Sequence, residues 1–378
     1  MTTMAIDNKD KKVLNVPHLR FPEFTEEWVN VSLKDVADFQ KERISSGLLD
    51  ESTYISTENI LQNFQGVQSA ISIPANTNVV AYKKNDILLS NIRPYLKKVW
   101  FSDRIGGCSA DVFVLRSKTC EPEFLYNVIA SDKFINYVMS GAKGVKMPRG
   151  DKNQMESFSF SIPAVVEQRK ISRLFQLLDE RIVTQNKIIE DLKKLKSAIS
   201  ERLFNAIKGD VVVLEDIGDV VKGKQINGEF LSESGKYYVM NGGIEPSGFY
   251  NDYNVEANTI SISEGGNSCG YVQFNACPFW SGGHCYTIQN TTDNVKTEYL
   301  YQFLKSKESE IMKLRIGSGL PNIQKKDLAK FKITIPNISE QKVISAFLSS
   351  FERKADVEMN FVNLLLEEKQ YLLRQMFI

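Results

Sequence analysis

The chain of 378 residues has only two histidines, His18 and His284, so a histidine-based catalytic triad has few candidates. No apolar run reaches the roughly 18–20 residues that span a bilayer. The polar start M-T-T-M-A-I-D-N-K-D-K-K predicts no signal peptide. The five cysteines lack the spacing of a disulfide framework, so reduced thiols in a cytoplasm are their simplest interpretation. A formal net charge of +1 neither supports nor excludes a nucleic-acid partner.

Motifs for cofactors and metals are also missing. Residues 218–224, G-D-V-V-K-G-K, match a phosphate-binding loop up to the lysine, but Gln225 stands where Ser or Thr belongs. Cys269, Cys277, His284 and Cys285 lack the paired C-x-x-C spacing of a zinc site. There is no glycine fingerprint for a nucleotide cofactor in a convincing strand–helix–strand setting. The sequence therefore predicts a non-catalytic protein with no cofactor and no metal.

What the chain does contain is an internal repeat. Residues 161–204 begin S-I-P-A-V-V-E-Q-R-K-I-S, and residues 334–377 begin T-I-P-N-I-S-E-Q-K-V-I-S, 173 positions later and without a gap. A repeat of this length determines the architecture of the chain. The identical residues are Ile162, Pro163, Glu167, Gln168, Ile171, Ser172, Leu192, Lys196 and Phe204, which recur as Ile335, Pro336, Glu340, Gln341, Ile344, Ser345, Leu365, Lys369 and Phe377.

Each copy predicts one long helix. From Ile171 to Leu203 apolar residues recur at steps of three, four and seven, and the second copy keeps the same register from Ile344 to Met376. Charged residues occupy the other faces, which indicates a coiled coil rather than two unrelated surface helices. If the intervening domain has its ends close together, the two helices run antiparallel. Around 40 residues at ~1.5 Å each would form a rod of roughly 60 Å, with one domain at each end.

The repeat divides the chain into four parts: a first domain at 1–160, a helix at 161–207, a second domain at 208–333 and a second helix at 334–378. The first domain contains short β-rich runs such as Asp86–Leu89 and Asp111–Leu115, and a helix near Glu123–Met139. The predicted fold class is α+β: two α/β domains separated by an antiparallel two-helix coiled coil, related by an internal pseudo-twofold repeat.

The duplication continues into the domains. Residues 86–101 align with 259–274 at the same 173-residue offset, but the loop inside is basic in one copy and glycine-rich in the other. Gly144 and Met147-Pro148 likewise align with Gly317 and Leu320-Pro321. A repeated framework with diverging loops is expected of two copies of one binder that read different targets.

The loops carry Arg, Lys and Asn side chains with an occasional aromatic ring, which suit contacts to phosphates and base edges. The alternative for any single cluster is an ordinary solvated charged surface. The candidate DNA-binding residues are Asn91, Arg93, Tyr95, Lys97, Lys98, Lys143, Lys146 and Arg149 in the first domain, and Lys222, Lys224, Gln225, Asn267, Ser268, Arg315, Ser318 and Asn322 in the second.

Four stretches together resemble a known family. They are V-P-H-L-R-F-P-E-F followed by Trp28, S-N-I-R-P-Y-L at 90–96, G-G-N-S-C-G with P-F-W at 265–280, and the duplicated I-P…E-Q…I. In this order they resemble the DNA specificity (S) subunit of bacterial type I restriction–modification systems, over nearly the whole chain.

The resemblance implies that each domain is a target recognition domain for double-stranded DNA and that the chain reads a bipartite sequence. It also implies that the two helices are spacers that dock two methyltransferase (M) subunits, and that restriction (R) subunits join this core. S-adenosylmethionine binding and the adenine pocket would then belong to the methyltransferase. Two other classes are alternatives: a coiled-coil scaffold that binds no nucleic acid, and a self-contained DNA-modifying enzyme, which would need a cofactor or metal motif.

Overall fold

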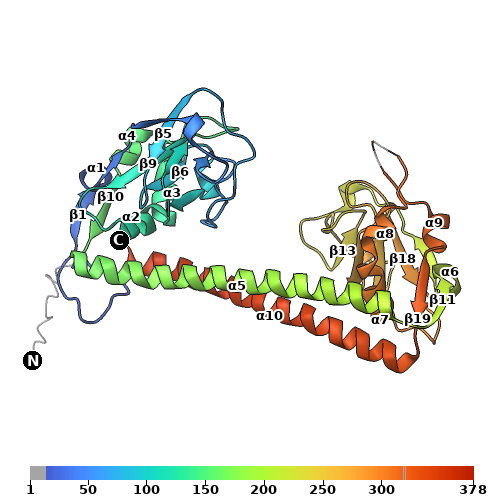
Figure 1. The fold of residues 1–378 in the computed structure, drawn as a ribbon. Coiled ribbons are helices and arrows are strands. Elements are labelled where there is room, and N and C mark those ends of the chain that lie inside the picture. Colours follow the sequence, from blue (N-terminus) through green and yellow to red (C-terminus); the bar gives the residue numbers. More distant parts are fainter. Residues whose placement is uncertain (1–13, 318, 320) are drawn as a thin grey trace, which may run out of the picture. The chain divides into compact units, whose positions relative to one another are not determined.

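The computed structural model describes residues 14–317, 319 and 321–378. The chain forms two compact units, Met1–Thr184 with Phe361–Ile378, and Gln185–Asn360. Each unit contains one globular domain and a part of each of two long helices, α5 (Val165–Ala206) and α10 (Ile338–Met376), the long green and red helices of Figure 1. Among the helices of the described residues, none combines the length and apolar character that crossing a bilayer requires.

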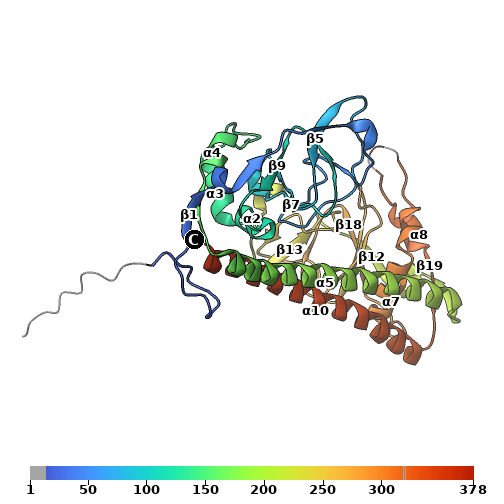
Figure 2. The same ribbon diagram turned by 60° about the vertical axis from the view of Figure 1, so that its left-hand side comes forward.

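The first unit contains two four-stranded sheets and a two-stranded ribbon, with helices α2 and α3 labelled beside the strands in Figure 2. The ribbon pairs β1 (Val29–Ser32) with β10 (Ser159–Ile162), and α1 (Leu33–Val36) follows β1. One sheet has the order β2 (Ala37–Phe39), β9 (Val112–Ser117), β6 (Ile87–Ser90), β7 (Val99–Phe101). The other has the order β3 (Arg43–Ser45), β5 (Asn78–Tyr82), β8 (Gly106–Cys108), β4 (Tyr54–Ile55). The helices are η1 (Ser46–Leu48), η2 (Pro94–Leu96), α2 (Pro122–Ile129), α3 (Asp132–Ser140) and α4 (Lys152–Glu156).

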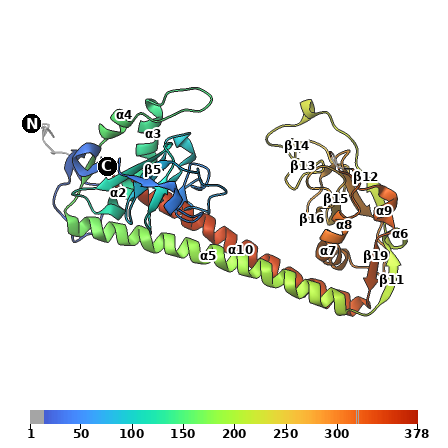
Figure 3. The same ribbon diagram turned by 45° about the horizontal axis from the view of Figure 1, so that its top comes forward.

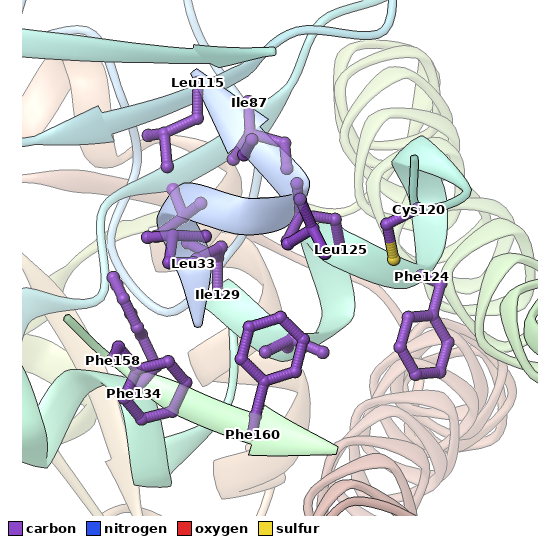
Figure 4. Close-up of a cluster of buried hydrophobic side chains, with 14 of the residues drawn as sticks. Leu33, Ile87, Leu115, Cys120, Phe124, Leu125, Ile129, Phe134, Phe158 and Phe160 are labelled. Atoms are coloured by element: carbon purple, nitrogen blue, oxygen red, sulfur yellow. The ribbon is translucent and has the colours of Figure 1, made fainter. Parts of the chain in front are cut away.

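The core of this unit forms where α2 packs on the first sheet. Phe124, Leu125 and Ile129 come from α2, and they belong to one buried cluster with Ile87 and Leu115 of the sheet (Figure 4). The apolar residues of α2 recur at helical spacing, so one face of the helix is removed from water.

The helix predicted near Glu123–Met139 is in fact two helices. The first ends at Ile129, with Ala130 as its C-cap, and Ser131 caps the second, because its hydroxyl accepts a hydrogen bond from the backbone N–H of Phe134 at 3.3 Å. Serine competes for backbone hydrogen bonds in this way and therefore favours helix starts over helix interiors.

The second unit repeats this plan (Figure 3). Its ribbon pairs β11 (Asp210–Val213) with β19 (Lys332–Ile335), and α6 (Leu214–Ile217) follows β11. Its four-stranded sheet has the order β12 (Asp219–Lys222), β18 (Cys285–Gln289), β15 (Thr259–Ser263), β16 (Val272–Asn275). A smaller sheet has the order β14 (Phe249–Tyr250), β13 (Tyr237–Met240), β17 (Trp280–Ser281). The helices are η3 (Gly228–Phe230), α7 (Thr297–Ser306), α8 (Glu308–Met312) and α9 (Lys325–Ala329). The α+β fold with an internal repeat is confirmed.

Helices α5 and α10 are joined by the same ion pair in both units. In the first unit the Lys369 ammonium lies 2.5 Å from the carboxylate of Asp179, and in the second the Lys196 ammonium lies 2.6 Å from Glu352. Lys196 and Lys369 are 173 residues apart, as are Asp179 and Glu352; positions related by this offset are called equivalent below. In both units a later residue of one helix meets an earlier residue of the other, which confirms the antiparallel pairing.

The glutamine of the repeated Glu-Gln pair has one structural role in both units. In the first unit Gln168 donates to the carbonyl of Pro163 at 2.8 Å and accepts from the backbone N–H of Glu121, just before α2, at 2.9 Å. Gln341 makes the equivalent bonds to Pro336 at 2.9 Å and from Lys296, just before α7, at 2.8 Å. This side chain ties the start of α5 to the start of α2, and the start of α10 to the start of α7.

Candidate nucleic-acid interface

The structure brings the two basic loops of the first domain together. Backbone bridges join Arg149 to both Ile92 and Lys143. The N–H of Arg93 donates to the carbonyl of Pro148 at 2.8 Å, and the N–H of Gly150 donates to the carbonyl of Asn91 at 3.2 Å. The clusters at 91–98 and 143–149, which were predicted separately, therefore form one surface.

The second domain has the same loop framework at equivalent positions. Asn322 bridges both Gly265 and Ile316, and the N–H of Gly266 donates to the carbonyl of Pro321 at 3.0 Å. Each of these residues lies 173 positions after its counterpart in the first domain. The backbone is thus preserved from one domain to the other while the side chains differ.

Backbone torsion explains the glycines of the second-domain loop. Arg93 and Lys97 both adopt left-handed torsions, with φ of 51° and 53°. Their equivalents are Gly266 and Gly270, with φ of 75° and 91°. Glycine adopts such torsions without the steric cost that a Cβ brings. The first domain therefore retains two long cationic side chains at positions where the fold favours glycine, and strain of this kind is concentrated at functional sites.

Several cations of the first-domain surface are paired with carboxylates. Lys97 lies 2.5 Å from Asp132, Arg149 lies 2.9 Å from Asp111, and Lys143 lies 3.1 Å from Asp151. A backbone hydrogen bond from Gln154, together with the Lys143 ammonium, lowers the pKa of the Asp151 carboxyl. These pairs orient the cations and reduce the local positive charge.

The remaining first-domain candidates differ in accessibility. Lys146 and Tyr95 are exposed, and in the described part of the chain Lys146 has no ion-pair partner. The Lys98 ammonium instead donates a hydrogen bond to the carbonyl of Thr57 at 2.6 Å, within the same domain. Arg93 is half-buried, and its Nε atom has no hydrogen-bond partner.

In the second domain the candidate surface is built around a buried carboxylate. Glu264, which is 8% exposed, lies 2.6 Å from the Lys222 ammonium and accepts a hydrogen bond from the Tyr286 hydroxyl at 3.0 Å. Burial, followed by this hydrogen bond, raises the pKa of Tyr286. Glu264 is equivalent to Asn91, and each has one buried side-chain oxygen without a hydrogen-bond partner.

The other second-domain candidates are distributed over neighbouring loops. Asn267, Arg315 and Asn322 are exposed, whereas Ser268 is half-buried and its carbonyl accepts from the N–H of Tyr271 at 2.9 Å. Lys224 and Gln225 follow β12 and are exposed. The predicted residue Ser318 lies outside the described residues.

The sequence did not reveal the carboxylates that pair with the first-domain cations, or the tryptophan that contacts Lys224. Asp111 and Asp132 are far in sequence from the cations that they hold, so no local pattern revealed them. Trp280 donates through Nε1 to the carbonyl of Lys224 at 2.9 Å, and its ring lies 5.3 Å from that of Tyr250. The P-F-W motif was the only signal near this group, and it did not reveal the contact with Lys224.

The rejected catalytic motifs have ordinary structural surroundings. Residues Asp219–Lys222 of the G-D-V-V-K-G-K segment form strand β12, with no helix directly after it. Cys269 and Cys285 are buried, and Cys277 is exposed. Within residues 14–317, 319 and 321–378, no three His, Cys, Asp or Glu side chains are grouped as a metal site.

Comparison with known proteins identifies the family. The model of the type I restriction modification DNA specificity domain matches residues 25–194 and again 208–365. The chain therefore belongs to this family, and the resemblance noted in the sequence is confirmed.

Individual relatives show how far the similarity extends. A putative type I specificity subunit of Mycoplasma pneumoniae is 34% identical over 161 residues, which is 42% of this chain and 42% of that protein. The specificity subunit of the type I restriction enzyme MjaVIII of Methanocaldococcus jannaschii is 23% identical over 93% of this chain and 91% of its own. The crystal structure of a type I restriction–modification S subunit from M. genitalium has the same fold, with a TM-score of 0.64 and 18% identity, over 96% of this chain and 99% of that one.

Proposed function

We propose that this chain is the DNA-reading specificity subunit of a type I restriction–modification complex and has no catalytic activity of its own. Each domain reads one half of a bipartite double-stranded target. The observation that carries the proposal is the repeated loop framework, in which Arg149 and Asn322 occupy one backbone position but present different chemistry. One framework with two sets of side chains suits a protein that reads two different short sequences.

The two surfaces suit different contacts. In the first domain Arg93, Lys143 and Lys146 supply cations for the phosphate backbone, and Arg149 suits a guanine edge. In the second domain Asn267 and Asn322 carry the amide that pairs best with adenine in the major groove. Lys222, Lys224 and Arg315 supply the phosphate contacts there.

The two helices recruit the other subunits. Large apolar side chains are exposed on both helices, and groups of them mark sites of protein–protein contact. They are Val183, Ile188 and Leu195 on α5, and Val357, Leu364 and Tyr371 on α10. We propose that two methyltransferase subunits dock on these helices, that restriction subunits join this core in the cytoplasm, and that the methyltransferase supplies S-adenosylmethionine chemistry. The length of the helix pair would set the number of unread base pairs between the half-sites.

Methylome sequencing of the host with and without this gene tests the proposal. We expect one bipartite methylated motif to disappear when the gene is deleted. A salt-sensitive mobility shift that needs this chain together with the methyltransferase subunit would separate a DNA reader from a scaffold. Methyl transfer or cleavage by the purified chain alone would contradict the non-catalytic assignment.

A further inference from the structure

The two copies of the repeat differ at one buried glutamate. In the first unit, residues 14–28 form a segment that precedes β1, here called the lead-in. Arg20 of the lead-in donates from Nε and Nη2 to the two carboxylate oxygens of Glu167, at 2.7 and 2.8 Å. Glu167 lies in the first turn of α5 and is only 1% exposed. The N–H of Leu19 also donates to the carbonyl of Gln375 in α10 at 3.0 Å.

Phe21, the residue after Arg20, also packs over the start of α5. The ring of Phe21 lies 4.5 Å from the ammonium of Lys170, one turn further along α5, and Lys170 is also ion-paired with Glu23. An arginine followed by an aromatic ring thus covers the start of the first long helix, with a bidentate ion pair and a cation–π contact.

The equivalent face of α10 has no such cover. Glu340, the counterpart of Glu167, is exposed, and its carboxylate has no ion pair or hydrogen bond among the described residues. Val343 and Phe347, one and two turns along, are 69% and 47% exposed. Only residues 207–209 connect α5 to β11, so the second unit has no counterpart of the lead-in. Glu340, Val343 and Phe347 are called the open face below.

We propose that the open face binds a segment of the partner methyltransferase subunit that presents an arginine beside an aromatic side chain. This inference rests on the proposed function. A guanidinium matches the exposed carboxylate of Glu340, as Arg20 matches Glu167. Val343 stands where the first copy has Lys170, so this face offers an apolar surface to an aromatic ring.

A second copy of this chain is the less suitable occupant. Its lead-in is already engaged, because Arg20 is paired with a buried glutamate in its own first unit. Withdrawing Arg20 would leave the charge of Glu167 buried and unpaired, which is strongly unfavourable. We therefore assign the arginine to the methyltransferase subunit.

A labelled synthetic peptide of residues 14–28 is the probe for the chemistry of the open face. We expect saturable binding to the intact chain, weakened at least tenfold by Glu340→Lys and, independently, by Arg20→Ala in the peptide. Glu215→Lys is the matched control, because Glu215 is an exposed glutamate of the same unit, in α6 and outside both long helices. Equal binding to the wild type and to Glu340→Lys, or no saturable binding at all, would overturn the proposal.

Counting methyltransferase subunits tests the partner. Native mass spectrometry of the assembled complex should show two copies per wild-type chain and per Glu215→Lys chain, but one per Glu340→Lys or Phe347→Ser chain. Two copies on both open-face variants would overturn this inference and leave the proposed function intact, whereas no copy on the wild type would overturn the proposed function. Self-association of the chain alone that Glu340→Lys abolishes would overturn the assignment of the partner. Circular dichroism of each variant confirms that it is folded.

Discussion

Gln185 of α5 donates a side-chain hydrogen bond to Glu358 of α10, and the two residues are 173 positions apart. They therefore occupy the same position in the two copies of the repeat. In an antiparallel pair of equivalent helices, a position that contacts its own counterpart lies at the midpoint of the pairing. The ion pairs Lys369–Asp179 and Lys196–Glu352 are counterparts of each other, as this geometry requires.

Glu358→Ala should lower the stability of the second unit. Gln185 is 2% exposed, and loss of its acceptor would leave a buried amide unsatisfied at a cost of about 1–3 kcal/mol. Urea unfolding followed by circular dichroism measures this loss. Glu358→Gln is the control, because it restores an acceptor and should cost less than about 1 kcal/mol. An unchanged unfolding midpoint for Glu358→Ala would show that the midpoint bond contributes nothing.

Arg93→Gly combined with Lys97→Gly should separate DNA binding from folding. Glycine is the equivalent residue in the second domain and suits the left-handed torsions, so we expect the free energy of unfolding to stay within about 1 kcal/mol of wild type. DNA binding by the assembled complex should weaken, and the dependence of log K on log salt should become shallower by about two if both cations contact phosphates.

Asn85→Gly is the matched control for this variant, because Asn85 is also a non-glycine residue at positive φ, 70°, but lies outside the candidate surface. It should leave DNA affinity unchanged. If the double variant bound DNA as tightly as wild type, or failed to assemble with the methyltransferase, the role assigned to Arg93 and Lys97 would be wrong.

Asn322→Ala and Lys146→Ala should have different effects on specificity. Asn322 is proposed to read a base edge, so its loss should relax one position of one half-site and cost about 1–3 kcal/mol against the preferred base. Lys146 is proposed to contact phosphate, so its loss should weaken binding to all sequences about equally. Binding to a library of single-base target variants distinguishes these outcomes. A uniform loss for Asn322→Ala would argue against base reading.

The thiols should differ sharply in reactivity. Burial raises the pKa of Cys108 and Cys120 to about 12 and that of Cys285 to about 11, and it also raises the pKa of Cys269. Because Cys277 alone among the five cysteines is exposed, we expect one fast-reacting thiol per native chain with a thiol-specific dye at pH 8, and none in Cys277→Ser.

The buried thiols also predict a loss of stability in alkali. Their pKa values in the folded chain exceed the ordinary value of 9.0, so ionisation favours the unfolded chain. The stability that they contribute is present below pH 9 and is lost as the pH rises towards 11 to 12. A urea midpoint that did not fall above pH 9 would contradict this.

The repeat allowed most of the fold to be predicted. A gapless offset of 173 residues with a shared apolar register predicted two long helices and their antiparallel pairing, because helical periodicity is a local property. The apolar pattern predicted one helix where Ser131 caps the start of a second one, since capping depends on side-chain geometry as well as on hydrophobic spacing.

The site was less predictable because torsions and distant partners leave no local pattern. In the sequence, Arg93 and Gly266 differ in chemistry at equivalent positions. The structure shows that both have the same left-handed backbone conformation. The acidic partners of Lys97 and Arg149 come from other parts of the domain, at positions 132 and 111. The two basic loops were predicted as separate clusters, and neither their contact with each other nor their pairing with carboxylates was foreseen.

Exchange of the bridged loops tests the central claim most directly. Residues 143–149 and 316–322 occupy equivalent positions, and both loops are closed by the same backbone bridge. Methylome sequencing of cells in which 143–149 is replaced by the 316–322 sequence should show a change in one half of the methylated motif only. The other half and the spacer should stay the same. Changes in both halves, or an unaltered motif in a methylating strain, would contradict the account that each domain reads its own half-site.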